Sequence, residues 1–157
     1  MSTATIQEVE TVTHSTKTKL DDLEFVKLKI PKLIPIELIE AVKGRTFTPE
    51  QFYDYQERMV GNSYNHLYVL VDENKKIHGY LWAESNALDG SLFINTFSIS
   101  KEYWGKGEAI KKVTDFLDAF HKRLGATKIF WLTTNERFFL KKGFTRSKIV
   151  LLEYNSN

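Results

Sequence analysis

The chain has 157 residues, of which 42% are apolar and 27% are charged, and its formal net charge at pH 7 is +2. This length suits one globular domain with a tail, and the composition argues against a disordered chain or a membrane protein. The near-neutral charge does not favour a dedicated nucleic-acid binder. Because there is no cysteine, disulfides, thiolate zinc sites and a cysteine nucleophile are excluded.

The N-terminal region differs in composition from the rest of the chain. Residues 1–22 are rich in threonine, serine and charge, which predicts a flexible arm before a single domain at 23–157. No segment has the basic and apolar parts of a secretory signal, and no apolar run approaches the length of a bilayer span. We therefore expect a cytoplasmic protein without membrane attachment.

The apolar pattern of the next hundred residues predicts four strands and two helices. Period-two alternation and β-branched residues indicate strands at 23–30, 66–71, 76–85 and 91–99. Two helices are expected between the first and second strands, at 34–42 and from 49 to about 59. Thr48 suits the N-cap of the second helix, and Pro49 suits its first turn.

The most informative segment is a Gly-Lys-Gly turn at 105–107, between the strand at 91–99 and a long amphipathic helix. Gly105 and Gly107 tolerate backbone angles closed to other residues and, without a Cβ, let a ligand approach the main chain. The first N–H groups of the helix and its positive dipole end would then face an anion such as a phosphate. A tight connection without a ligand explains the turn equally well.

The remaining residues complete a mixed order of elements. Apolar residues at three- and four-residue steps carry the long helix to Leu124, and Gly125 suits its C-cap. A buried strand at 127–133, a short helix at 135–142 and a last strand at 147–154 are expected to follow. This order is typical of an α+β or α/β sandwich.

The order and two glycine-marked segments resemble the GCN5-related N-acetyltransferase (GNAT) superfamily over roughly residues 23–154. Members carry Gln/Arg-x-x-Gly-x-Gly/Ala in the turn; Gly107 and Ala109 match this pattern, whereas Trp104 replaces the Gln or Arg. The second signature, a short helix ending in Gly-Phe, is matched at 143–144. The resemblance implies an α/β (α+β) fold in which about four helices flank a mixed, mostly antiparallel sheet of about six to seven strands.

The resemblance also implies that acetyl-coenzyme A is the acetyl donor. Its peptide-like pantetheine arm would pair with the main chain around 97–99, and the next strand would splay away to open a slot. Amides of the turn would hold the pyrophosphate, with Lys106 adding charge, and Asn135 would bond the cofactor. The expected cofactor-binding residues are Phe97, Ser98, Ile99, Trp104, Gly105, Lys106, Gly107, Glu108, Ala109, Asn135, Phe138 and Phe139. No histidine pair has the spacing of a metal site, so we expect no metal.

The usual proton carriers of the superfamily are replaced in this sequence. Asn95 stands near the position where many members have a glutamate base, and Phe139 stands where they have a tyrosine acid. A strand bulge would move the first position by one residue. Glu84 is the nearest carboxylate that could act through a water, and the possible acids are Tyr80, Tyr103 and Tyr154. The catalytic candidates are Glu84, Asn95 and Tyr103, although a structural role explains each of them as well.

We therefore expect an N-acetyltransferase that moves an acetyl group from acetyl-coenzyme A to a primary amine by direct attack in a ternary complex, with positioning supplying most of the acceleration. The alternative is a catalytically degenerate member that binds coenzyme A without turnover or serves in assembly. Nucleic-acid binding is less favoured, because acidic residues interrupt the lysines near the turn. The acceptor would be a small-molecule or peptide amine, and the arm and aromatic content would allow a homodimer.

Overall fold

The computed structural model describes residues 18–41, 47–86, 90–105, 107–125, 128–133, 136–148 and 152–155. Within these residues one mixed sheet of five strands lies in the order β1-β2-β3-β4-β5. The strands are β1 (Glu24–Lys27), β2 (Asn65–Val71), β3 (Ile77–Ser85), β4 (Leu92–Ile99) and β5 (Ile129–Trp131). Neighbours from β1 to β4 are antiparallel, whereas β5 is parallel to β4.

Four α-helices and three short 3₁₀ helices accompany this sheet in the described residues. The α-helices are α2 (Ile36–Glu40), α3 (Pro49–Met59), α4 (Glu108–Leu124) and α5 (Glu136–Lys141). The 3₁₀ helices are η1 (Leu20–Asp22), η2 (Pro31–Leu33) and η3 (Lys101–Tyr103). None of the helices in these segments is long and apolar enough to cross a bilayer.

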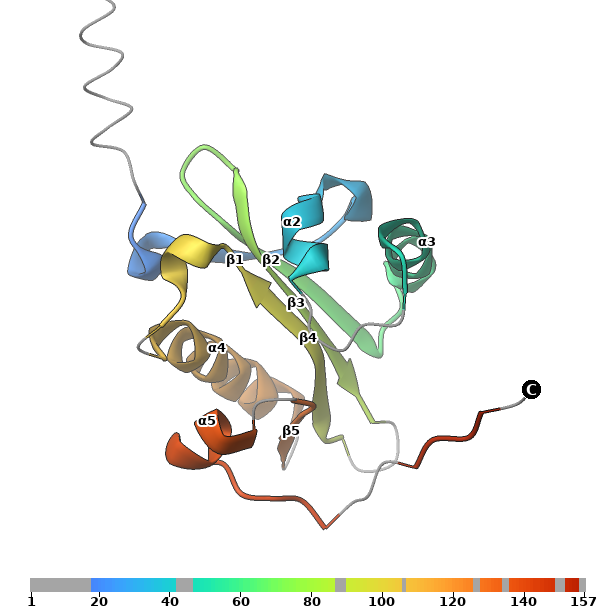
Figure 1. Ribbon diagram of the computed structural model, residues 1–157, viewed down its shortest axis with the longest axis vertical. Helices are drawn as coiled ribbons and strands as arrows, with labels where there is room; N and C mark the ends of the chain where they lie inside the picture. Colours follow the sequence, from blue (N-terminus) through green and yellow to red (C-terminus); the bar gives the residue numbers. More distant parts are fainter. Residues whose placement is uncertain are drawn as a thin grey trace, which may run out of the picture.

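Helices cover both faces of the sheet, with α2 and α3 on one side and α4 on the other (Figure 1). Consecutive strand residues point to opposite faces. In β3, accordingly, Tyr80 packs in the cluster under α2 and α3, whereas Leu81 packs in the cluster under α4. Both faces of β3 are therefore buried, and the described edges of the sheet are β1 and β5.

The start of α3 follows from a local sequence signal. The Gln51 N–H donates to Thr48 Oγ1, and the Thr48 N–H donates to Gln51 Oε1, at 3.2 and 2.9 Å. This reciprocal pair satisfies two donors that a helix end leaves open, and Pro49 occupies the first helical position as predicted.

We expect the substitution Thr48→Ala to lower the free energy of unfolding by about 1 kcal/mol, because it removes the oxygen that accepts from the Gln51 N–H. Urea unfolding would measure this change. Thr48→Ser keeps the oxygen and should retain most of the stability. An equal loss in both variants would mean that the hydroxyl contact does not stabilise α3.

A half-buried histidine links β2 to the core beside α4. His66 Nε2 lies 2.6 Å from Ser85 Oγ, and the ring packs edge-on against Phe120 with centroids 4.8 Å apart. Burial lowers the pKa of His66, and the charge of Lys27 lowers it further. The protonated form of His66 is therefore less favourable in the folded protein than in the unfolded chain.

This shift predicts acid sensitivity. The unfolded chain, in which the histidine pKa is about 6.5, binds more protons than the folded protein, so stability should fall as the pH drops below about 6.5 towards the lower folded pKa. We expect the free energy of unfolding to depend less on pH between 7 and 5 in His66→Gln than in the wild type. Unfolding curves at a series of pH values would show this, and identical slopes would contradict it.

Two predicted strands differ from the structure at the C-terminal end. Of the strand expected at 127–133, residue 127 lies outside the described residues, and among 128–133 only the three residues of β5 are in a strand. Of the last strand, expected at 147–154, the described residues 147–148 and 152–154 lie in no strand, while 149–151 lie outside the described residues. The described sheet consequently has five strands rather than six to seven.

Part of the expected N-terminal arm packs against the domain. Leu20 contacts a buried cluster that includes Ala109, and Lys112 Nζ lies 3.4 Å from the Asp21 carbonyl oxygen. Residues 18–22 thus lie close to the first turns of α4, and residues 1–17 lie outside the described part of the chain.

Candidate active site

A bulge in β4 decides which edge of this strand is open. Trp82 pairs with Thr96 and Ala83 pairs with Ile94, so Asn95 has no partner on β3. The extra residue shifts the alternation of main-chain N–H and C=O groups along β4 by one residue, so the groups that face β3 and those that face the other edge exchange places across the bulge. The shift by one residue that the sequence allowed is therefore present at Asn95.

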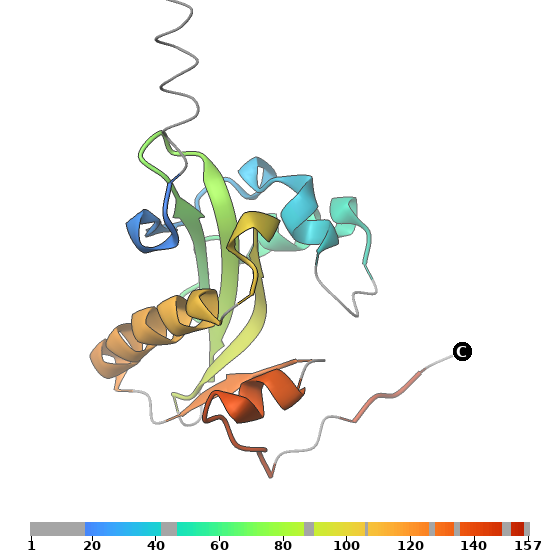
Figure 2. The same cartoon turned by 60° about the vertical axis from the view of Figure 1, so that its left-hand side comes forward.

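The next strand leaves β4 at this bulge. β5 pairs with β4 only between Leu92 and Ile94. One further bond between these segments runs from the Leu132 N–H to the Ile94 carbonyl oxygen, at 3.3 Å. Beyond it, no strand within the described residues covers this edge of β4, and β5 continues towards α5 at the lower end of the sheet (Figure 2).

The main chain of Phe97 and Ile99 faces the open edge. The Ser100 N–H donates to the His78 carbonyl oxygen at 2.8 Å, which fixes the pattern of antiparallel bonding to β3. Because that pattern alternates along a strand, the N–H and C=O groups of Phe97 and Ile99 point away from β3. The edge thus offers peptide groups with the spacing of a strand to a peptide-like ligand.

One of these groups has a side-chain partner. The indole N–H of Trp104 donates to the Ile99 carbonyl oxygen at 2.8 Å, and the ring is 55% exposed. Trp104 was expected to lie at the cofactor in place of Gln or Arg without donating hydrogen bonds as Arg would, and this stays a prediction. Its indole N–H is directed to the strand edge, so it supplies no donor to an anion in this arrangement.

The glycine turn has the backbone that the sequence predicted. Gly105 and Gly107 have φ angles of +107° and +74°, in the region that favours glycine. The Gly107 N–H donates to the Gly105 carbonyl oxygen, whereas the N–H groups of Glu108 and Ala109 have no main-chain acceptor among the described residues. Of the amides from 105 to 109 that were expected to hold the pyrophosphate, the Gly107 N–H is therefore engaged within the turn, while the N–H groups of Glu108 and Ala109 stay candidates to face an anion. Lys106 lies outside the described residues.

A cavity of about 250 Å³ lies beside this turn, between α4 and the end of α5. It is lined by Gly107, Glu108, Ile110, Lys111, Thr114, Lys142 and Phe144. An ideal Cβ on Gly107 would lie 2.5 Å from Lys142 Cε and 3.4 Å from Phe138 Cζ, so any other residue would crowd this space. A bare Cα, a helix N-terminus and a nearby cavity are chemically suited to a phosphate group.

The comparison with known families identifies the family to which a chain with this arrangement belongs. The model of the Acetyltransferase (GNAT) family matches residues 35–144, which include the open strand, the glycine turn and α5. The chain belongs to the GNAT acetyltransferase family. No curated protein matches the sequence significantly.

Solved structures show the same fold. A possible acetyltransferase from Clostridium difficile 630 has a TM-score of 0.69 at 12% identity, covering 86% of this chain and 98% of that chain. An aminoglycoside acetyltransferase from an uncultured soil metagenomic sample, in complex with sisomicin, has a TM-score of 0.65 at 18% identity, with coverages of 87% and 98%. Glucosamine-6-phosphate N-acetyltransferase from Arabidopsis thaliana has a TM-score of 0.59 at 21% identity, with coverages of 85% and 99%. The GNAT fold expected from the sequence is thereby confirmed.

Two of the catalytic candidates of this GNAT protein lie together at the bulge. Glu84, near the end of β3, pairs with Phe93, and its Oε2 lies 3.5 Å from Asn95 Nδ2. The Glu84 side chain is exposed, so a proton can move between it and water. This carboxylate is therefore near the point where β4 and β5 separate.

The third candidate, Tyr103, lies beyond the opposite end of β4. Its hydroxyl donates to the Thr18 carbonyl oxygen at 2.7 Å. Burial raises the pKa of Tyr103, and the charges of Glu102 and Asp72 raise it further. The structure does not bring Tyr103 to Glu84 and Asn95, and its hydroxyl hydrogen is engaged by the N-terminal segment.

The other two tyrosine candidates have opposite environments, since Tyr80 is buried and Tyr154 is exposed. The Tyr80 hydroxyl donates to Gln56 Oε1, and burial raises the pKa of Tyr80 well above its usual value, so this phenol stays neutral. Tyr154 is 89% exposed in the C-terminal segment.

The partner of Tyr80, Gln56, is fully buried and was assigned no role from the sequence. A glutamine four residues after the buried Phe52 on the same helix face was the signal that could have identified it.

The expected cofactor residues on α5 have different environments. Phe139 is 8% exposed and packs against Trp131, with ring centroids 4.9 Å apart, and against Phe144, at 5.2 Å. Its ring is therefore part of an aromatic core that carries no hydroxyl. Phe138 contacts the side chain of Lys142 beside the cavity, and Asn135 lies outside the described residues.

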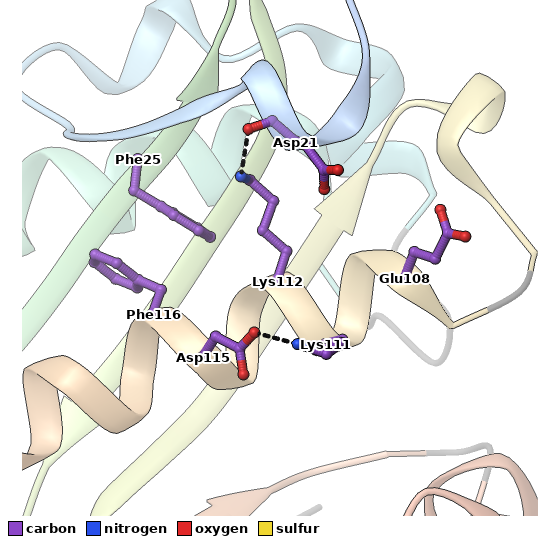
Figure 3. Close-up of a pocket in the computed structure, with 7 residues that line it drawn as sticks. All are labelled: Asp21, Phe25, Glu108, Lys111, Lys112, Asp115 and Phe116. Atoms are coloured by element: carbon purple, nitrogen blue, oxygen red, sulfur yellow. Dashed lines mark hydrogen bonds and ion pairs between the residues drawn. The ribbon is translucent and has the colours of Figure 1, made fainter.

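Another hollow, of about 670 Å³, lies between η1, β1 and α4 (Figure 3). Its lysines lie near oxygen atoms: Lys111 Nζ is 2.7 Å from Asp115 Oδ2, and Lys112 Nζ is directed to the Asp21 carbonyl oxygen. Acidic side chains therefore lie on both sides of the two lysines along this part of α4. Among the described residues, no group of three His, Asp or Glu side chains is placed to hold a metal ion.

Proposed function

We propose that this GNAT protein transfers an acetyl group from acetyl-coenzyme A to a primary amine by direct attack in a ternary complex. The observation that carries the proposal is the open edge of β4, where peptide groups of Phe97 and Ile99 lead to the N-terminus of α4. A ligand with peptide-like and diphosphate parts matches these two features in one direction. Acetyl-coenzyme A supplies the acetyl group as a reactive thioester.

The chain's own residues would divide the binding between them. The main chain of Phe97 and Ile99 would pair with the pantetheine amides, which requires the Trp104 indole to share or leave the Ile99 carbonyl oxygen. The N–H groups of Glu108 and Ala109 would bind the diphosphate. Holding donor and amine together would supply most of the acceleration.

Proton transfer would depend on Glu84. An amine attacks only in its neutral form, and the exposed Glu84 carboxylate can accept a proton from the ammonium directly or through a water. Asn95, 3.5 Å from this carboxylate, would orient it. Because Phe139 has no hydroxyl, the sulfur would leave with a proton from the amine or from solvent.

A second function, binding of coenzyme A without turnover, is favoured by one observation. The positions where many members carry the base and the acid hold Asn95 and the buried Phe139. A protein that kept the glycine turn for binding coenzyme A but lost both proton carriers would use the nucleotide as a structural ligand or in an assembly.

Two measurements separate these functions. Calorimetric titration with acetyl-coenzyme A should show one site per chain, and no heat over a range of temperatures would remove both functions. Release of free thiol should then be followed with amines of different classes: an amino sugar phosphate, an aminoglycoside, a polyamine and a peptide with N-terminal alanine. Turnover with any of them supports the enzyme, whereas binding without turnover across the panel supports the ligand-binding function.

The remaining expectations belong to the same proposal. We propose a cytoplasmic protein with an arm at 1–22 and one domain at 23–157, with no dedicated role in nucleic-acid binding. A homodimer is compatible with this proposal. Light scattering at several protein concentrations would measure the oligomeric state.

A further inference from the structure

Strand β3 also has a bulge, and the extra residue is a histidine. The pairing with β2 shifts between Leu70 and Val71, so His78 has no partner on that strand. A bulge re-aims the side chain of its extra residue. The His78 ring is buried and packs edge-on against Tyr103 of η3, with ring centroids 5.8 Å apart. It therefore lies against the segment that leads to the glycine turn.

Both ring nitrogens of His78 face carboxylates. Nε2 lies 2.8 Å from Asp72 Oδ2, and Nδ1 lies 3.5 Å from Glu102 Oε1 in η3. Asp72 belongs to the turn between β2 and β3, where its Oδ1 accepts from the N–H groups of Asn74 and Lys76. The hydrogen bond with His78 lowers the pKa of Asp72, so this carboxyl is ionised near neutral pH. The ring thus links the hairpin turn to η3.

The two contacts together require both ring protons. An ionised carboxylate only accepts hydrogen bonds, so each nitrogen that faces one needs a hydrogen. The neutral ring has one such hydrogen, whereas the protonated ring has two and can donate to Asp72 and Glu102 at once. A further titratable group in contact with the ring, Tyr103, has a pKa raised by burial and donates its hydroxyl to Thr18, so it stays neutral. Only the protonated ring therefore satisfies both carboxylates.

The main chain of His78 holds the same segment. Its carbonyl oxygen accepts from the Ser100 N–H at 2.8 Å and from Ser100 Oγ at 3.1 Å. The Tyr103 N–H in turn donates to the Ser100 carbonyl oxygen at 3.0 Å. The placement of Gly105, two residues after Tyr103, is therefore tied to His78 through both its ring and its main chain.

We propose that His78 is a positioning residue for the nucleotide site: its protonated ring bridges Asp72 and Glu102 and so holds η3 and the glycine turn in the arrangement that receives the diphosphate. The inference rests on the proposed function, because it concerns the same nucleotide. The side chains of His78 and Asp72 are 9% and 10% exposed, whereas that of Glu102 is 37% exposed. Because exposed ion pairs are weaker than buried ones, the contact to Glu102 is the one that should open when the ring loses a proton.

Calorimetry with dephospho-coenzyme A at about pH 6 and about pH 8 would test this, since histidine side chains ordinarily change charge in this range. The probe keeps the diphosphate but lacks the 3′-phosphate, and phosphate monoesters themselves change charge at about pH 6. We expect the wild-type Kd to rise about threefold from the lower to the higher pH, the size of one partly exposed ion pair. His78→Gln should bind about threefold more weakly at the lower pH and lose the pH dependence.

Glu102→Gln is the matched variant on the other side of the contact. Its amide can accept from a protonated ring nitrogen or donate to a bare one, so the contact persists in both states of the ring. We expect Glu102→Gln to bind at least as tightly as the wild type at the lower pH and to keep that affinity at the higher pH. The control is His66→Gln, which removes a histidine that packs on Phe120 and should keep the wild-type pH dependence.

Each outcome has one meaning. A wild-type Kd that is unchanged or falls with rising pH, or a pH dependence that persists in His78→Gln or Glu102→Gln, would overturn the inference while leaving the proposed function in place. A flat profile in His66→Gln would also overturn it, because the titration would then belong to His66. A wild-type protein that binds no nucleotide at either pH would overturn both. Thermal unfolding midpoints would confirm that the variants fold, and Glu102→Gln carries the test if His78→Gln does not.

Discussion

Replacing Gly107 by tryptophan is expected to lower the affinity for acetyl-coenzyme A by about 100-fold or more, equivalent to the loss of two hydrogen bonds to charged oxygens. The new side chain would begin in the space of Lys142 Cε and would cover the N–H groups of Glu108 and Ala109. Calorimetric titration of the variant measures the effect directly.

The matched control is Gly125→Trp at the other end of α4. Gly125 has a φ of +70°, close to the +74° of Gly107, and an ideal Cβ there meets nothing within 4 Å. Both variants should therefore bear a similar backbone strain of about 1–2 kcal/mol, visible as lower thermal unfolding midpoints. Only the variant at Gly107 should lose the nucleotide. Unchanged affinity in Gly107→Trp would refute the placement of the phosphate site.

Glu84→Gln is expected to lower kcat by about 100-fold or more, within the range found for loss of a general base. The amide cannot accept the ammonium proton, and the branch of the rate profile that reports ionisation of the base should disappear. Because Glu84 lies at the bulge and away from α4, the Kd for acetyl-coenzyme A should not change. Initial rates across pH, with the best amine from the panel, would test this.

Glu73→Gln provides the control, since it removes the same charge from the exposed turn between β2 and β3. Its rates should match those of the wild type. If Glu84→Gln keeps the wild-type rate at every pH, then Glu84 is not the base. The reaction would then proceed with an amine that loses its proton to solvent.

The elements that the sequence predicted well depend on local signals. The capping box at Thr48 starts α3 where expected, and the positive φ angles at Gly105 and Gly107 occur in the predicted turn. Helix caps and glycine turns are determined by a few neighbouring residues, so one sequence suffices to find them. The bulge at Asn95 was anticipated only as a possibility, because it depends on pairing with β3.

The contacts that shape the candidate site are not local. The Tyr103 hydroxyl is directed to the Thr18 carbonyl oxygen, 85 positions away in the chain. Lys142 meets Gly107 only because α5 packs back towards the turn. No periodicity or motif reports such partners, which explains why Tyr103 was considered as an acid and Lys142 was not considered at all. The short β5 has the same origin: its sequence favours a strand, but β4 offers it a partner only as far as Ile94.

The most direct test of the account is a crystal structure of the protein with acetyl-coenzyme A. The account predicts the diphosphate at the N–H groups of Glu108 and Ala109 and the pantetheine arm along Phe97 and Ile99, with the indole of Trp104 moved from the Ile99 carbonyl oxygen or shared with it. A nucleotide bound at another surface, with the edge of β4 bare and these N–H groups bonded to the protein's own carbonyls, would contradict it.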